Sequence, residues 1–251
     1  MYCYFFVITG ILIPFFGTVF GSATVFFTKR NLEGRYQKYF CAFAAGVMTA
    51  AAIWSLLLPS LERSDTCIPA IAGTVLGILG FLFGDWFAEK TLSSHSSDST
   101  SRQRLLNLAV TLHNIPEGMA VGVIFSEALF SDHRAMFGAF ALSLGIAVQN
   151  FPEGAILSLP AAARNQTKCK AFRIGVWSGI VEPAGAVAAL LLTRLITPLL
   201  PWILSFAAGA MIYVVIRDLI PESCGDREER MPCFFFGFGF VLMMLLDVCT
   251  G

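Results

Sequence analysis

Long apolar runs recur along the whole chain, and most are close to the length of about 20 helical residues that crosses the hydrocarbon core of a bilayer. The runs are continuous and do not alternate between apolar and polar residues, which indicates helices and not the strands of a membrane barrel. The third and eighth runs are short and the fifth is long, so their ends are less sharply defined. The sequence predicts an all-α polytopic membrane protein with eight transmembrane helices, near residues 4–27, 39–59, 68–84, 105–125, 135–160, 174–192, 196–216 and 231–246.

Composition supports a membrane location and excludes several other classes of protein. Hydrophobic residues make up 56% and charged residues 14% of the 251 residues, against about 25% charged in an ordinary soluble domain. The formal net charge is zero, so we expect the lipid bilayer as a partner and no nucleic acid. The seven cysteines are scattered and never spaced as CxxC, which excludes a disulfide framework and a thiolate zinc site.

The distribution of Lys and Arg among the connections predicts the orientation of the chain, because cytoplasmic connections are enriched in these residues. Fourteen of the 17 basic residues lie in the first, third, fifth and seventh connections, and only Arg63, Arg134 and Arg194 lie in the others. We therefore expect both termini on the extracytoplasmic side of a multi-pass protein in a plasma or bacterial inner membrane. The first apolar run has no basic region before it, so we expect this helix to be retained and not cleaved as a signal peptide.

Two short motifs occur twice. Residues 42–48 have the sequence AFAAGVM and residues 205–211 have SFAAGAM, while HNIPEG at residues 113–118 is matched by QNFPEG at residues 149–154. The two members of each pair lie on helices of opposite direction, which predicts an inverted repeat about an axis in the membrane plane. We expect a single transporter domain over residues 1–251, in which helices 1–3 and 6–8 flank a central pair, helices 4 and 5.

Three glutamates, Glu117, Glu153 and Glu182, lie inside predicted membrane helices. A charge at the bilayer centre costs about 2.5–3.5 kcal/mol on insertion scales. No Lys or Arg lies inside these three spans to pair with the carboxylates. A proton on each carboxylate, a bound cation, or a network of hydrogen bonds between helices remain as ways to offset this cost.

Helical spacing places the polar residues of each repeated motif on one face of its helix, since residues three and four apart are neighbours there. An imidazole, carboxylates and amides on two such faces can converge on a divalent ion, and this mixture suits Zn²⁺ or another first-row metal better than Mg²⁺ or Ca²⁺. The candidate metal ligands on helices 4 and 5 are His113, Asn114, Glu117, Gln149, Asn150 and Glu153.

Prolines and glycines accompany these motifs. Pro116 and Pro152 each remove a backbone donor, so we expect them to open and bend their helices beside the site. Gly118 and Gly154 are expected to let helices 4 and 5 approach closely. Glu182 also precedes a proline at a similar depth in helix 6, which makes it a candidate further ligand or bridge.

With HNIPEG, QNFPEG 36 residues later, SGIVEP and the AAGVM segment, the chain resembles the ZIP family of divalent metal transporters, in particular its GufA-like branch. The resemblance covers essentially the whole chain. It implies eight helices with outward termini, a homodimer, and import of Zn²⁺ into the cytoplasm by an elevator-like motion, with iron, manganese or cadmium as possible further substrates.

The resemblance also implies a binuclear site in which Glu117 and Glu153 bridge two metals. One metal would be held by these two residues with His113 and Gln149, and the second by the same two with Asn114, Asn150 and Glu182. Where relatives can carry Asp after the glutamine of helix 5, this chain has Asn150, which removes one negative charge from the second position.

The same resemblance implies residues along a transport pathway. Met48 matches a methionine that lines the pathway, and Asp247 matches an acidic residue near the outer entrance. Asp85, Asp218 and Glu222 lie at the predicted inner ends of helices 3 and 7, where they are candidates for cytoplasmic release of the metal.

Two other functions stay open from the residues alone. An intramembrane metallohydrolase would use bound zinc to activate water, but the chain has no HExxH motif and its candidate ligands recur as a pair. A proton or alkali-cation exchanger would use the glutamates as proton carriers and His113 to tune them. We expect a transporter and not an enzyme.

Overall fold

The computed structural model describes residues 2–28, 34–92, 98–131, 133–163, 166–224 and 230–250, and within these ranges the regular structure is entirely helical. Two π-helical segments, η1 (Ala52–Leu57) and η3 (Val215–Leu219), and a short 3-10 turn, η2 (Thr197–Leu199), connect pieces of longer helices. The α-helices are α1 (Tyr2–Phe27), α2 (Gly34–Ala51), α3 (Leu58–Glu62), α4 (Ile68–Leu92), α5 (Asp98–Ala128), α6 (His133–Ala163), α7 (Lys168–Gly179), α8 (Val181–Leu191), α9 (Thr193–Ile196), α10 (Leu200–Val214), α11 (Ile220–Ser223) and α12 (Met231–Thr250).

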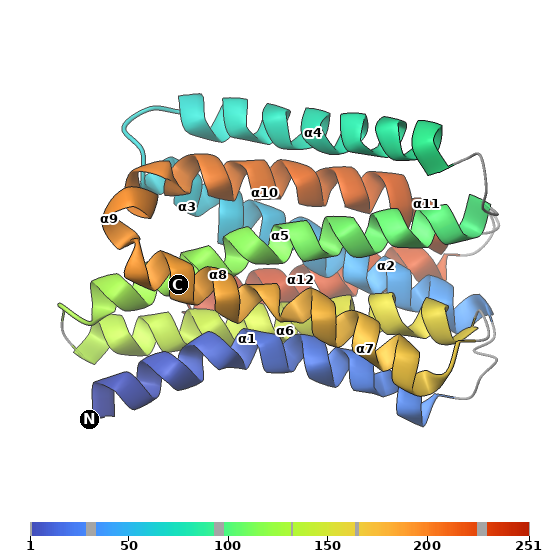
Figure 1. The fold of residues 1–251 in the computed structure, drawn as a ribbon, viewed down its shortest axis with the longest axis horizontal. Coiled ribbons are helices and arrows are strands. Elements are labelled where there is room, and N and C mark those ends of the chain that lie inside the picture. The colour runs from blue at the N-terminus through green and yellow to red at the C-terminus, as the bar shows by residue number, and fades with distance from the viewer. Residues whose placement is uncertain are drawn as a thin grey trace.

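Seven helical segments of the described chain are long and apolar enough to cross a membrane. They correspond to seven of the eight spans that the sequence predicts, and the third continues beyond residue 84 as far as Leu92. The remaining span is α5, a helix of 31 residues that contains HNIPEG and runs through the same bundle as the others (Figure 1). The expected all-α polytopic membrane fold is confirmed.

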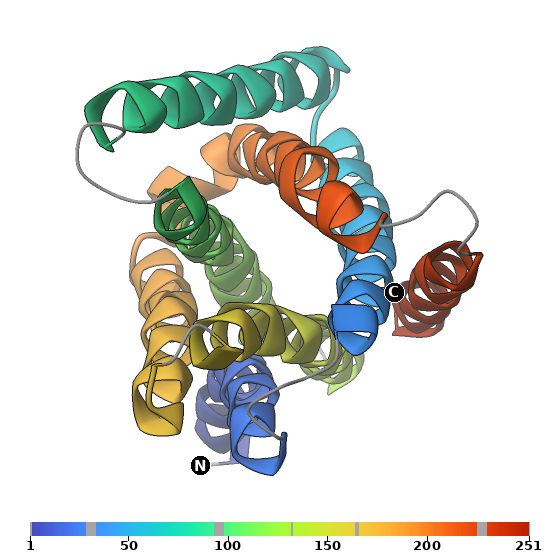
Figure 2. The same ribbon diagram turned by 90° about the vertical axis from the view of Figure 1, so that its right-hand side faces the viewer.

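The helices form two groups that meet along the middle of the bundle. In the first group, α1 packs against α6 and α7, and α5 packs against α6 and α8. In the second group, α2 packs against α12, and α4 packs against α10. Contacts of α5 with α10 and of α6 with α2 join the groups, and Figure 2 shows these four helices around the centre with the others outside them.

Glycines set the closeness of packing in the second group. A Cβ at Gly46 would collide with the carbonyl oxygen of Phe236 on α12, and a Cβ at Gly209 would collide with that of Thr74 on α4. Small residues of this kind let membrane helices approach backbone to backbone. Gly46 and Gly209 are the equivalent glycines of the two AAG motifs, so each motif packs its helix against one neighbour in the same way.

The helices continue through the prolines of the repeated motifs and break at other places. The α-helix continues without interruption through Pro116 in α5 and Pro152 in α6, because a single missing hydrogen bond is tolerated where neighbouring helices hold the chain. Instead, the sixth span breaks at Ile180, between α7 and α8. The π-helical segments η1 and η3 begin four residues after Met48 and Met211, the last residues of the two AAG motifs.

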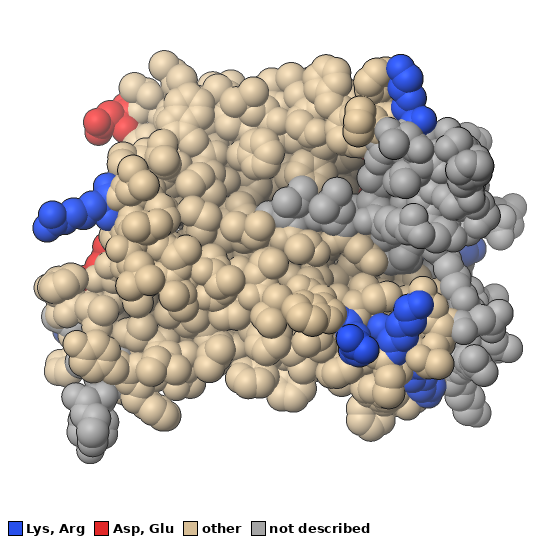
Figure 3. Space-filling model, in the orientation of Figure 1, with Lys and Arg blue, Asp and Glu red and all other residues tan. Residues whose placement is uncertain are grey.

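Charged residues lie toward the two ends of the bundle. Figure 3 shows charged side chains near both ends of the visible face, with Lys or Arg at each end and Asp or Glu at one, and a broad band without charge between them. Many large apolar side chains are exposed along the helices, including Phe5, Phe83, Trp177 and Phe234. An apolar belt between two polar ends is the surface that a bilayer covers.

Candidate metal site

The polar residues of the repeated motifs lie inside the first group, on α5, α6 and α8. All described side chains among the predicted ligands are buried, with at most 3% of their surface exposed. The side chain of His113 lies outside the described part of the structure, although its backbone belongs to α5. The described ligands are Asn114, Glu117, Gln149, Asn150, Glu153 and Glu182.

Gln149 joins two of the three buried glutamates. Its side-chain nitrogen donates to Oε1 of Glu117 at 2.6 Å and to Oε1 of Glu153 at 3.3 Å. Glu153 is one helical turn from Gln149 on α6, whereas Glu117 comes from α5. The amide therefore sits between the carboxylates and connects the central pair of helices.

Asn150 and Glu182 form the second contact in the site. The amide nitrogen of Asn150 donates to Oε2 of Glu182 at 2.7 Å and to the carbonyl of Pro14 at 3.2 Å. Oε1 of Glu182 accepts from the hydroxyl of Thr18 on α1 at 3.0 Å. Glu182 is thus held from both sides, and charge-assisted bonds of this kind are stronger than neutral ones.

Asn114 contacts the broken sixth span. Its nitrogen donates to the carbonyl oxygen of Ser178 at 3.3 Å, just before α7 ends. The hydroxyl of Ser178 also lies 2.9 Å from that of Thr111, one turn earlier on α5. These bonds fix the end of α7 to the face of α5 that carries the motif.

Each of the three amides leaves its oxygen without a hydrogen-bond partner among the described residues. Asn114 Oδ1, Gln149 Oε1 and Asn150 Oδ1 are all buried and accept no hydrogen bond there. Buried acceptors are normally satisfied, because an unsatisfied one carries its full desolvation cost. Three such oxygens beside three carboxylates make a site that favours a cation.

The donor set is mixed and not purely acidic. Among the described side chains, no group of three His, Cys, Asp or Glu residues is placed to hold a metal ion. The amides occupy the positions between the carboxylates, and turning an amide about its last bond exchanges its nitrogen for its oxygen. The same side chains can therefore close a hydrogen-bond network without metal and offer oxygen ligands to a cation.

A small pocket of about 50 Å³ extends from this site toward one end of the bundle. It reaches Glu117 and Gln149 at the buried end and Arg63 at the other. Between them its walls are mostly apolar, formed by Leu56, Pro59, Ala120, Ile124, Leu142, Ile146, Leu200 and Leu204. The pocket lies between the first and second groups, because α5 and α6 supply one wall and η1, α3 and α10 supply the other.

Asp247 lies beside this pocket. Its Oδ1 accepts from the hydroxyl of Ser55 at 2.7 Å, and Ser55 lines the pocket from η1. Its Oδ2 has no hydrogen-bond partner among the described residues. Met48, another predicted pathway residue, is 1% exposed and packs in a core cluster to which both groups contribute residues.

The candidates for cytoplasmic release lie away from the buried site. Asp85 on α4 accepts from the hydroxyl of Tyr213 at 2.8 Å and from Nε of Arg217 at 3.0 Å. Asp218 lies next to Arg217 in η3, and Glu222 lies on α11, which packs against α2. Asp85 thus already faces a cation, the Arg217 guanidinium.

Sequence analysis missed the polar residues on α1 and α7 that complete the site. Thr18 and Ser22 are four apart on α1, and Ser22 donates to the carbonyl of Gly154 at 3.1 Å. Two hydroxyls at helical spacing in an apolar run, beside Gly17 and Gly21, were the available signal.

The expectation that Gly118 and Gly154 let helices 4 and 5 approach each other closely was wrong. Gly118 faces the backbone of Glu182 on α8, and Gly154 faces that of Thr18 on α1. Each central helix therefore packs closely against an outer helix.

Comparisons with known proteins identify the family of the chain. The profile of the family described as "ZIP Zinc transporter" matches residues 90–247. The Zinc transporter ZIP11 of Xenopus tropicalis is 32% identical over 96% of each chain, and the Zinc transporter GufA of Myxococcus xanthus is 34% identical over 79% of this chain and 81% of its own. The Zinc transporter ZIPB of Bordetella bronchiseptica is 34% identical over 88% of this chain and 74% of its own. The chain belongs to the ZIP zinc transporter family.

Proposed function

We propose that this protein moves Zn²⁺ across a membrane through the buried site on α5, α6 and α8. The observation that carries the proposal is the grouping of three carboxylates with three amide oxygens that accept no hydrogen bond among the described residues. Buried acceptors of this kind favour a cation. Membership in the ZIP family and the names of three relatives support zinc as the substrate.

The ligand set that we propose has two metal positions. Glu117 and Glu153 bridge them, since Gln149 already connects the two carboxylates. Gln149 and His113 complete the first position. The second is completed by Asn114, Asn150 and Glu182, of which Asn150 and Glu182 are in contact. With Asn150 in place of a carboxylate, the second position carries less negative charge and binds metal more weakly than the first.

Transport requires that the site open to each side in turn, and we propose that the first group moves against the second as in an elevator. The pocket and the sparser contacts between the groups support this division. The equivalent packing of Gly46 and Gly209 supports an inverted repeat, which makes such a motion reversible between two related states. Met48 and Asp247 lie on the stationary side of the pathway, and release on the far side uses Asp85, Asp218 and Glu222.

The orientation follows from the basic residues of the connections. We propose outward termini, inward flux and a location in a plasma or bacterial inner membrane, with a homodimer as the assembled form. Iron, manganese and cadmium are further substrates to be tested.

Metal uptake into vesicles tests the proposed function. Purified protein is reconstituted, and flux of Zn²⁺, Fe²⁺, Mn²⁺ and Cd²⁺ is measured for the native chain, for Glu117→Ala with Glu153→Ala, and for the control Glu62→Ala, an exposed residue at the end of α3. We expect zinc flux in the native and control proteins and none in the double variant. Metal binding without flux under any gradient would contradict transport and leave a metalloenzyme or a metal-stabilised structure as the alternative.

A further inference from the structure

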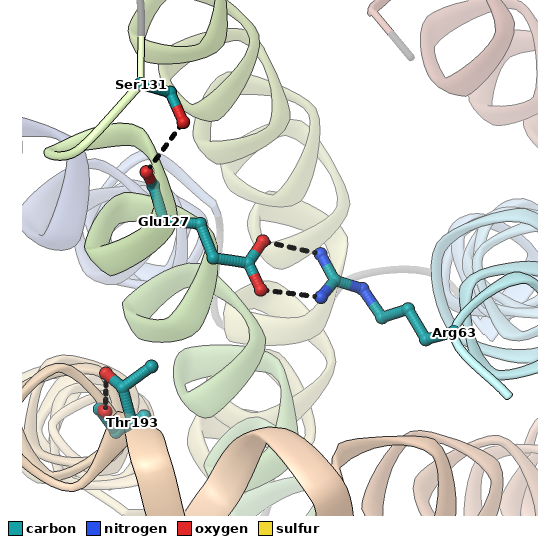
Figure 4. Close-up of polar contacts among 5 residues, drawn as sticks. Arg63, Glu127, Ser131 and Thr193 are labelled. Atoms are coloured by element: carbon teal, nitrogen blue, oxygen red, sulfur yellow. Dashed lines mark hydrogen bonds and ion pairs between the residues drawn. The ribbon is translucent and has the colours of Figure 1, made fainter.

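An ion pair lies at the end of the pocket opposite the buried site. The two terminal nitrogens of Arg63 donate to the two carboxylate oxygens of Glu127, at 3.0 and 3.2 Å. Figure 4 shows the guanidinium and the carboxylate face to face, with the backbone carbonyl of Glu127 accepting from Ser131. The same Arg63 lines the pocket that reaches Glu117 and Gln149.

The two partners belong to different groups of helices. Arg63 follows α3, which packs against η1, α4 and α10 of the second group. Glu127 is in the last turn of α5, which packs mainly against α8 of the first group. Any separation of the two groups at this end must therefore break or stretch the ion pair.

The position of Glu127 is electrostatically unfavourable within its own helix. A carboxylate in the last turn lies next to the negative end of the helix dipole, where a basic residue is preferred. Arg63 supplies the positive charge from another helix, with geometry that uses both oxygens. The pair is also accessible to water, with 30% and 44% of the two side chains exposed, so it is weak enough to open.

We propose that Arg63 and Glu127 form a gate at the mouth of the pocket, which holds the first and second groups together over the route to Glu117 and Gln149. This inference rests on the proposed function, because a gate on the route to the site has a role only if a cation passes through the site. With the pair formed, the mouth is closed and the net charge at this point is neutral. When the pair opens, α3 and α5 separate and the pocket becomes accessible from solvent.

Cysteine accessibility tests the gate without any metal. Ile146 lines the pocket and is 4% exposed, so Ile146→Cys reports opening when a charged, water-soluble thiol reagent labels it. The reporter is placed in a background in which the exposed cysteines Cys67, Cys169, Cys224 and Cys233 are replaced by Ser, and labelling is corrected with the same protein lacking the reporter. Purified protein in detergent is used, so that the reagent reaches both ends.

We expect Arg63→Gln and Glu127→Gln each to increase the labelling rate by up to about fivefold, the range expected for an exposed pair. The double exchange of Arg63→Glu with Glu127→Arg restores the pair with reversed charges and should return the rate to the native value. Equal labelling in all four proteins, or no restoration in the exchanged one, would overturn the gate.

Salt provides a second measurement of the same ion pair. Exposed ion pairs are screened by salt, so raising the ionic strength should speed labelling of the reporter in the native pair and have little effect in Glu127→Gln. An equal response in both would also overturn the gate. The labelling rate and zinc flux are independent measurements. If labelling depends on the ion pair but no zinc flux occurs, the proposed function alone is contradicted. If zinc flux occurs but labelling does not depend on the ion pair, the gate alone is contradicted.

Discussion

The hydroxyl of Thr18 on α1 donates to the carboxylate of Glu182 on α8 at 3.0 Å, with both side chains buried. The bond joins the first and sixth membrane spans at the depth of the candidate metal site. It also leaves the carboxylate in one orientation, since its other oxygen accepts from Asn150. Removal of this donor is therefore expected to affect both stability and the geometry of the site.

Thr18→Val keeps the shape of the side chain and removes the donor. A hydrogen bond to a charged group contributes about 1.5–3 kcal/mol, so we expect a lower Tm in detergent and reduced zinc flux. Thr18→Ser keeps the hydroxyl and should retain most of both. Thr74→Val is the matched control, because Thr74 bonds within its own helix, to the carbonyl of Ala70 at 2.7 Å. An equal loss of flux in the Thr74 variant would contradict a specific role for Thr18.

Gly118→Ala tests the close approach of α5 and α8. The added Cβ would collide with the carbonyl oxygen of Glu182, and backbone cannot move aside as a flexible side chain can. We expect a loss of folded protein, or a decrease in Tm larger than that of any other single variant considered. Gly138→Ala on α6 is the control, since no atom lies within 4 Å of its added Cβ. That change should leave Tm unchanged or raise it slightly, as alanine favours helix.

Gln149→Glu replaces the amide between Glu117 and Glu153 with a third carboxylate. Without metal, the substitution removes the amide donor, and the new carboxylate repels those of Glu117 and Glu153, so we expect a lower Tm. With zinc, the extra carboxylate is a stronger ligand, so the increase in Tm on adding metal should be larger than in the native protein. Gln166→Glu, in the connection before α7, should show neither change. If zinc raises the Tm of Gln149→Glu only as much as that of the native protein, the metal does not bind at Gln149.

Zinc itself should stabilise the folded protein. At a free concentration of about 100 times Kd, a ligand that binds only the folded state adds about 2.7 kcal/mol, and a chelator should reverse the shift in Tm. Glu153→Gln removes one charge from the site and should reduce the shift strongly, whereas Glu62→Gln at the exposed end of α3 should retain it. Thermal unfolding with and without zinc measures both, and an unchanged shift in Glu153→Gln would exclude this residue as a ligand.

Much of the fold followed from the sequence, because crossing a bilayer imposes a strong and local requirement on length and apolarity. The spans near residues 4–27 and 231–246 correspond to α1 and α12, and the breaks between spans fall where charged residues gather. The prediction was weaker for features inside the helices. Pro116 and Pro152 leave α5 and α6 unbroken, whereas Ile180 interrupts the sixth span.

Part of the site was also available from the sequence. A carboxylate in an apolar membrane span is costly, so Glu117, Glu153 and Glu182 stand out in the sequence, and helical spacing adds Asn114 and Gln149. The hydrogen-bond partner of each of these side chains could not be predicted from the sequence. That Gln149 bridges two glutamates, and that Asn150 and Thr18 hold the third, depends on which helices are neighbours.

The sequence by itself determined that the chain forms membrane helices and that the polar residues of each repeated motif share one face of their helix. Only the tertiary structure decided that Gly118 packs against α8 and Gly154 against α1, and that Arg63 and Glu127, 64 positions apart, meet across the two groups. The physical reason is that spacing along a helix fixes which residues share a face. Which helix covers that face is settled by backbone contacts and hydrogen bonds between segments far apart in the chain.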